Sequence, residues 1–156
     1  MRNVLLVFMI FLSYLSFGQK VITFSEMKNE KLEISTLDSI FSTAIQIDSS
    51  NCVFGNRRDE YNETYFEYMV DLRSYLLNKG IDWDTLVVGH QIIYFNKNGR
   101  VEYFIYSFDD GLVSKEKEAL FRKLVLKYIS ENKMKISADS NFQQCGTIYY
   151  SPKTKK

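Results

Sequence analysis

Apolar residues recur at intervals of three and four in three segments of the chain, which is the spacing of one face of a helix. The first segment begins at Leu37 and ends near Asp48, and Ser35 with Asp38 has the form of a capping box at its start. The second segment has the strongest signal, and Gly80 follows it as a left-handed C-cap. Its apolar face consists of Tyr61, Tyr65, Tyr68, Met69, Leu72 and Leu76. Ser114 predicts the N-cap of a third helix, whose inward face consists of Leu120, Phe121, Leu124, Val125, Tyr128 and Ile129.

Elsewhere the pattern is that of strands, with runs of β-branched and aromatic residues. Residues 85–95 and 101–108 predict a hairpin, because Asn98-Gly99 between them tolerates the positive φ of a tight turn. Gly89 and His90 interrupt the first arm, where a bulge fits. Two further runs complete the pattern: Val21–Phe24 predicts an edge strand, and Thr147–Tyr150 predicts a last strand before Pro152.

These elements predict an α+β domain with the order β-α-α-β-β-α-β. We expect an antiparallel sheet of three or four strands packed against two or three helices. The second arm of the hairpin is apolar on both faces, and Phe104, Tyr106 and Phe108 share one of them. This strand is therefore either central and covered twice, or it presents an aromatic face to a partner. Under the second alternative these three aromatic residues are the candidate interaction face.

The first eighteen residues have the composition of a secretory signal peptide. Arg2 precedes an apolar run that starts at Val4, and Ser16 and Gly18 are the small residues expected before a cleavage site at Gln19. The alternative is an uncleaved membrane anchor, but Val4–Phe17 is only 14 residues long, whereas a spanning helix needs about 20. We expect residues 1–18 to be removed, leaving a single domain over residues 19–156 with no transmembrane segment, exported to the periplasm or secreted.

Charge and motifs exclude several functions. Without Arg2, the 20 basic residues of the chain become 19, which equals the 19 acidic residues. A neutral domain lacks the basic surface that nucleic acid requires, so no nucleic-acid partner is expected. His90 is the only histidine, and the chain has no glycine-rich phosphate loop, nucleophile elbow or calcium loop. We therefore expect no cofactor and no metal, and no motif identifies an enzyme.

Cys52 and Cys145 are the only cysteines. In an oxidising compartment an even number of cysteines favours a disulfide between them. The alternative is two buried thiols that act as small apolar side chains. A Cys145 nucleophile with His90 as its base also remains open, because thiolate catalysis needs only one base within reach.

The residues from about Gln91 to Tyr150 resemble the TonB C-terminal domain in the order of their elements. A strand, the turn Asn96–Arg100, a second strand, the helix through Leu120 and Leu124, and a final strand at Gly146-Thr147-Ile148 follow that layout. Pro152 is the only proline, so the chain departs from the proline-rich spacer of the energy transducers in that family. The resemblance implies a small periplasmic protein-protein module rather than a transducer.

The leading functional hypothesis is therefore an exported, non-catalytic protein-binding module of the bacterial periplasm or cell envelope. One alternative is a small secreted hydrolase that uses the carboxylates of Asp82 and Asp84, beside Trp83. Another is an exported inhibitor or immunity-type protein, which binds one cognate enzyme tightly.

Overall fold

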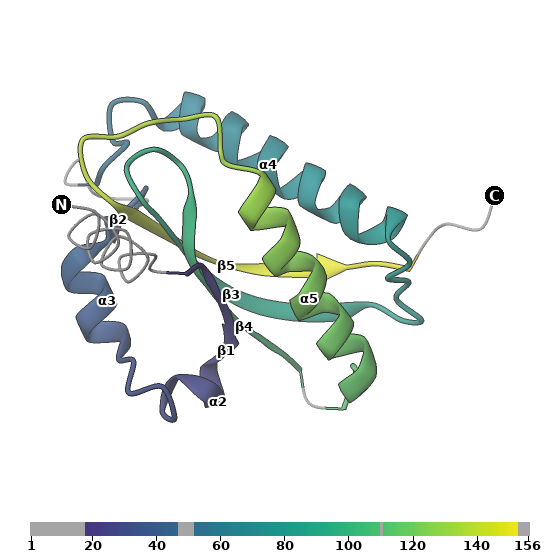
Figure 1. Cartoon of the computed structure of the whole chain (residues 1–156). Coiled ribbons are helices and arrows are strands. Elements are labelled where there is room, and N and C mark those ends of the chain that lie inside the picture. The colour runs from purple at the N-terminus through teal and green to yellow at the C-terminus, as the bar shows by residue number, and fades with distance from the viewer. Residues whose placement is uncertain (1–17, 47–51, 110, 153–156) are drawn as a thin grey trace, which may run out of the picture.

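The computed structural model describes residues 18–46, 52–109 and 111–152, and these residues form a five-stranded sheet with helices on both faces (Figure 1). The strands lie in the order β1-β4-β3-β5-β2. Their bounds are Lys20–Thr23 for β1, Ser42–Thr43 for β2, Val87–Phe95 for β3, Val101–Phe108 for β4 and Phe142–Tyr150 for β5. The helices are α2 (Phe24–Met27), α3 (Ile34–Ile40), α4 (Arg58–Asn78) and α5 (Lys115–Glu131).

The α+β class is confirmed, but the sheet is mixed rather than antiparallel. Its three long strands pair antiparallel, whereas the short strands β1 and β2 pair parallel with β4 and β5 at the two edges. The predicted order of elements is correct except that it omits α2 and β2. Apart from Gly18, the predicted signal peptide lies outside the described residues. No helix within the described ranges has both the length and the apolar character needed to span a bilayer.

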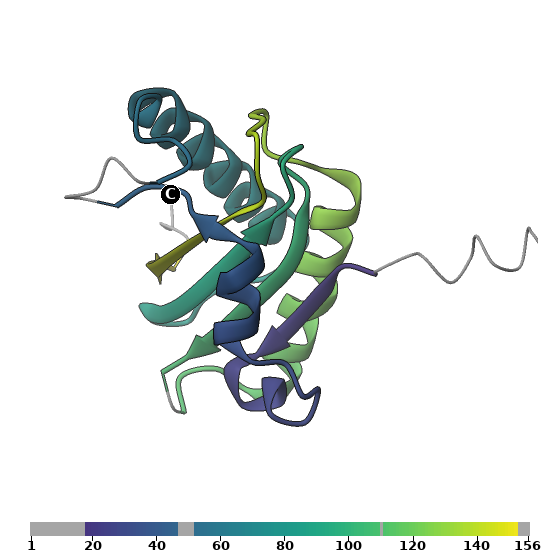
Figure 2. The same cartoon turned by 90° about the vertical axis from the view of Figure 1, so that its left-hand side faces the viewer.

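The two faces of the sheet carry separate apolar cores. Helices α4 and α5 lie on one face, and α3 lies on the other (Figure 2). Strand β4 contributes to both cores, with Phe104 in the first and Ile105 in the second. The first of the two alternatives for this strand is therefore correct: it is covered on both faces.

Helix α3 is shorter than the pattern predicts. Its N-cap is Glu33, and Ser35 does not form the predicted capping box. The helix ends at Ile40 because Ser42 and Thr43 turn outward to pair with Phe142 and Gln143 of β5. The last predicted residues of this helix, at 47 and 48, lie outside the described part of the chain.

Helices α4 and α5 form as predicted. Gly80 ends α4 with φ +93°, and the amide of Ile81 donates to the Leu76 carbonyl at 3.1 Å in the manner of a Schellman motif. Ser114 caps α5 by accepting a hydrogen bond from the Lys117 amide at 3.2 Å. One inward position is wrong, because Leu120 is 39% exposed.

The hairpin of β3 and β4 is confirmed, including the turn at Gly99, which has φ +77°. Its irregularity lies between Tyr94 and Phe95, whereas Gly89 and His90 pair in register. The predicted bulge is therefore misplaced. A capping box does occur in the chain, but at Thr23 and Glu26, where it starts α2 directly after β1.

Candidate binding surface

An apolar groove of about 330 Å³ runs between α4 and the outer edge of β5. Two large apolar side chains on its α4 wall are exposed to solvent, Phe66 by 69% and Val70 by 43%. Tyr149 of β5 is 62% exposed, and its side chain lies on the opposite face of the sheet, like that of Thr147. Exposed apolar side chains are common singly, but neighbouring ones that line a groove indicate a contact surface.

The position of this groove follows from the helical repeat of α4. Tyr61, Tyr68 and Leu72 point into the core at intervals of three and four residues. Phe66, Val70 and Arg73 keep the same spacing on a neighbouring flank of the helix. That flank lies beside β5, since these residues line the groove together with Thr147–Tyr150.

The backbone of β5 presents hydrogen-bonding groups along the same edge. The Ser42 amide donates to the Asn141 carbonyl at 3.1 Å, and the Ala44 amide donates to the Gln143 carbonyl at 2.9 Å. These two carbonyls therefore point away from β3. Because the direction of the backbone groups alternates along a strand, the amides and carbonyls of Cys145, Thr147 and Tyr149 also point outward. The Cys145 carbonyl accepts a hydrogen bond of 2.9 Å from the side-chain amide of Gln144, which an added strand would replace.

Strand β2 covers only the beginning of this edge, since it pairs with Phe142 and Gln143 alone. Within the ranges that the structure describes, no strand pairs with the outer side of residues 144–150. Strand β5 also contains no charged residue and no proline. Exposed edges are usually protected by charges, proline or short length. The opposite edge shows this protection, because β1 has four residues and begins at Lys20, which pairs with Glu30.

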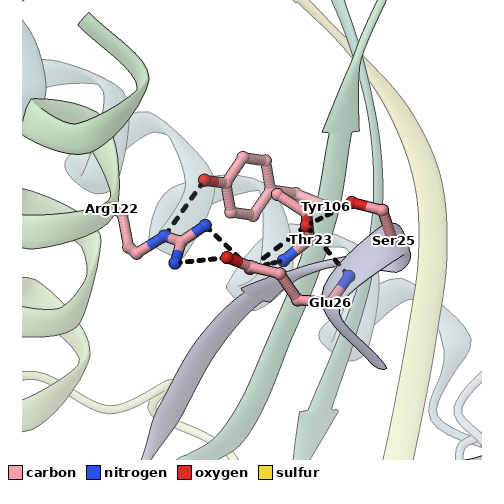
Figure 3. Close-up of polar contacts among 5 residues, drawn as sticks. All are labelled: Thr23, Ser25, Glu26, Tyr106 and Arg122. Atoms are coloured by element: carbon pink, nitrogen blue, oxygen red, sulfur yellow. Dashed lines mark hydrogen bonds and ion pairs between the residues drawn. The ribbon is translucent and has the colours of Figure 1, made fainter. Parts of the chain in front are cut away.

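A polar cluster joins α2, β4 and α5 near the β1 edge of the sheet (Figure 3). Arg122 of α5 binds Glu26 with two parallel hydrogen bonds of 2.9 and 2.7 Å, and its Nε donates to the Tyr106 hydroxyl at 3.5 Å. Partial burial acts to raise the pKa of Glu26, but hydrogen bonds from Arg122 and Thr23 outweigh it and leave this pKa lowered. Burial raises the pKa of Tyr106 to about 12. The cluster ties α2 to the core helix and keeps its ion pair charged at neutral pH.

We expect Glu26→Gln to destabilise the protein by about 1 kcal/mol at pH 7, since the pair is bidentate but more than a third exposed. Glutamine can still form the capping box, so the loss reports the ion pair. Because the Glu26 pKa is lowered on folding from an ordinary value of 4.5, this stability is present above pH 4.5 and lost as the pH falls through the folded pKa. Urea unfolding of the parent protein and of Glu26→Gln between pH 7 and pH 3 measures the difference in their free energies of unfolding. A difference that does not shrink at low pH would contradict this assignment.

His90 lies between a carboxylate and a hydroxyl on the face of the sheet that carries α3, where its side chain is exposed. Its Nε2 is 3.6 Å from Asp109 Oδ1, and its Nδ1 is 3.2 Å from Thr147 Oγ1. A carboxylate, an imidazole and a hydroxyl arranged in this order can activate the hydroxyl as a nucleophile when the site is enclosed. The His90 side chain is 53% exposed, however, and the neighbouring 380 Å³ hollow is lined by Asp109 but by neither His90 nor Thr147. The arrangement is a solvated surface network.

The predicted interaction face is not an exposed patch, because Phe104 and Tyr106 belong to the core and Phe108 is partly buried against it. Phe104 is fully buried and Tyr106 is 2% exposed. Phe108 packs against Phe121 of α5 with a ring separation of 5.0 Å. All three side chains lie beneath α5, since that helix needs a broad apolar surface on the sheet.

The segment Asp82-Trp83-Asp84 has a structural role. Trp83 is 2% exposed and packs on Tyr150 with a ring separation of 4.8 Å. Asp84 binds Lys117 Nζ at 2.7 Å, and the same amine donates to the Asp82 carbonyl. These contacts attach the loop before β3 to the first turn of α5, with the indole in the core rather than in a sugar-binding cleft.

Cys52 and Cys145 are not linked by a disulfide in the structure, and Cys145 is exposed rather than buried. The Thr43 carbonyl accepts from Val53 while the next amide, that of Ala44, donates toward β5. Val53 is therefore about two strand spacings, roughly 10 Å, from β5, whereas disulfide-linked Cα atoms lie within about 7 Å. The bridge stays a prediction that requires the backbone near Cys52 to move.

The predicted pair of a Cys145 nucleophile and a His90 base gains no support from the structure, since His90 is opposite Thr147 and Cys145 is opposite Ile92.

Residue-level reasoning from the sequence missed the groove itself. Phe66 and Val70 are the signal that was available, because both are apolar yet lie off the predicted buried face of α4.

Comparison of the chain with family models, with curated proteins and with solved structures finds no match. The resemblance to the TonB C-terminal domain therefore stays a prediction.

Proposed function

We propose that this chain is an exported, non-catalytic protein-binding module of the cell envelope, and that it binds its partner in the groove between α4 and β5. The observation that carries the proposal is the coincidence of exposed Phe66 and Val70 on α4 with a stretch of β5, residues 144–150, whose outer side pairs with no strand among the described residues. Aromatic side chains at the centre of an apolar patch are typical of residues that dominate binding energy. The composition of residues 1–18 supports export.

This proposal accounts for two features at once. An uncharged open edge promotes aggregation unless a partner covers it. Exposed phenylalanine on a helix likewise stabilises a complex more than it stabilises the free protein, since in the free protein its ring faces water. The groove offers both a main-chain and a side-chain contact surface, whereas the polar contacts of His90 and of Asp84 lie at solvated surfaces.

We expect Phe66→Glu to reduce partner binding at least tenfold, because it places a charge in the apolar groove. The measurement is photo-cross-linking in the producing cells, with benzoylphenylalanine in place of Tyr149, followed by quantification of the adduct. Fractionation of the same cells shows whether the adduct lies in the envelope.

The matched control is Leu126→Glu, which makes the same change at a 41% exposed position of α5 outside the groove. It should leave the cross-link unchanged, and both variants should keep the thermal stability of the parent. A missing adduct, or an adduct that survives Phe66→Glu, would overturn the proposed site.

A further inference from the structure

We infer that the partner enters this groove as an extended segment that adds to β5, with apolar side chains at alternate positions facing α4 and a carboxylate facing Arg73. The inference rests on the proposed function, because it specifies the chemistry of what the same groove binds. It is carried by the backbone direction of β5, the apolar flank of α4 and the charge of Arg73.

The outward amides and carbonyls of Cys145, Thr147 and Tyr149 determine the shape of the ligand. An added strand satisfies such groups in a regular ladder, whereas a helix or a globular surface leaves most of them to water. The stretch from Cys145 to Tyr149 spans four residue steps, or about 13 Å. A segment of about five residues in extended conformation therefore covers it.

The two sides of that added strand meet different surfaces. On one side lies the flank of α4, where Phe66, Met69 and Val70 line the groove. On the other side lies an exposed part of the α3 face of the sheet, where Thr147 contacts His90. Because side chains alternate along a strand, every second residue of the partner should be apolar and the residues between them polar.

Arg73 is the charged residue that lines the groove, and no acidic side chain lines it. Within the described residues Arg73 forms no ion pair. A carboxylate on the incoming segment supplies its complement, because guanidinium groups bind carboxylates through paired hydrogen bonds. An aspartate, a glutamate or a chain terminus of the partner meets this requirement.

The same charge argues against a second copy of this chain as the occupant. Pairing of β5 with β5 of another copy satisfies the backbone, but β5 contains no acidic residue to meet Arg73. The apolar flank with a cation is instead complementary to a segment that is apolar and acidic. We therefore assign the groove to a different protein.

Selection of random nonapeptides displayed on phage against the full chain, as the cell exports it, tests this assignment. We expect enriched peptides with alternating apolar residues and one acidic residue. Their synthetic forms should bind the parent protein and lose at least tenfold in affinity with Phe66→Glu. Arg73→Glu should weaken them about threefold to tenfold, and exchanging their acidic residue for lysine should restore binding to that variant.

Other outcomes separate this inference from the proposed function. Peptides that require Phe66 for binding and yet have apolar residues that do not alternate would refute the added strand. Peptides whose affinity is unchanged by Arg73→Glu would refute the carboxylate. In both cases the cross-linking result, and with it the proposed function, would be unaffected. Failure to enrich any peptide sensitive to Phe66→Glu would also refute the inference, and the cross-link would then decide the proposed function alone. A dimer of the chain that Phe66→Glu dissociates would identify a second copy as the occupant and overturn the inference.

Discussion

Replacing Gly99 with alanine should destabilise the protein by about 3 kcal/mol or more, because the added Cβ would combine a left-handed backbone with overlap on two carbonyl oxygens. Gly99 has φ +77°, and a Cβ there would lie 2.3 Å from the Met134 carbonyl oxygen and 2.8 Å from that of Ile136. The left-handed conformation costs a non-glycine residue about 1–2 kcal/mol, and the overlap with backbone atoms adds about 1–3 kcal/mol. The backbone cannot give way easily, since the Met134 amide donates to the Gly99 carbonyl at 2.9 Å.

Two other glycines separate strain from overlap. Gly80 has φ +93°, and no atom lies within 4 Å of the position that an added Cβ would occupy. Gly80→Ala should therefore reduce the free energy of unfolding by only about 1–2 kcal/mol. At Gly146 an added Cβ would have no neighbouring atom within 4 Å, and φ is outside the left-handed range. Gly146→Ala should therefore change stability by less than about 0.5 kcal/mol. Urea unfolding of the three variants gives the ranking. Equal losses for Gly99→Ala and Gly80→Ala would contradict the close approach of the loop after α5 to the hairpin turn.

Phe121→Ala should cost about 3–5 kcal/mol, as expected for removal of a fully buried phenylalanine. Phe121 is 0% exposed, and its ring lies 5.2 Å from that of Tyr106 and 5.0 Å from that of Phe108. The ring of Tyr150 on β5 is also within 5.9 Å. The residue joins α5 to two strands of the sheet, so its loss leaves a cavity that the rigid aromatic neighbours cannot fill.

The neighbouring residue is the matched control. Leu120 has similar apolar character on the same helix but is 39% exposed, so Leu120→Ala should cost about 1 kcal/mol or less. Denaturant midpoints at constant slope measure both effects. Comparable losses at the two positions would mean that α5 is rotated about its axis relative to the structure.

The elements that are strongly determined by local sequence were predicted well. Helix α4 has a continuous apolar face and a glycine C-cap, α5 has a serine N-cap, and Asn98-Gly99 closes the hairpin. Each of these signals acts through neighbouring residues, so no knowledge of the tertiary structure is required. The capping box of Thr23 and Glu26 was equally readable and would have located α2.

The parallel edges could not be predicted in the same way. Strand β2 contains two residues, Ser42 and Thr43, and neither has a strong strand preference without its partner β5. Strand β1 lies parallel to β4 although about 80 residues separate them. Pairing over such a separation depends on the packing of the helices between the strands, which single-sequence patterns do not contain.

The candidate site, too, was predictable from the sequence only in part. The sequence shows that β5 lacks charges and that Phe66 and Val70 lie off the buried face of α4. Which side of β5 is open, and that this side meets α4, follows only from the sheet order. Without that order Phe104, Tyr106 and Phe108 remain a candidate interaction face, whereas in the structure they pack against α5.

Amide hydrogen exchange by NMR in the presence of a selected nonapeptide tests the central claim most directly. In the free protein the outward amides of Cys145, Thr147 and Tyr149 should exchange rapidly, while those of Gln144, Gly146 and Ile148, which face β3, exchange slowly. The peptide should protect the three outward amides at least tenfold in the parent protein and not in Phe66→Glu. Protection confined to other parts of the chain, such as the β1 edge, would show that the partner does not bind by adding a strand to β5.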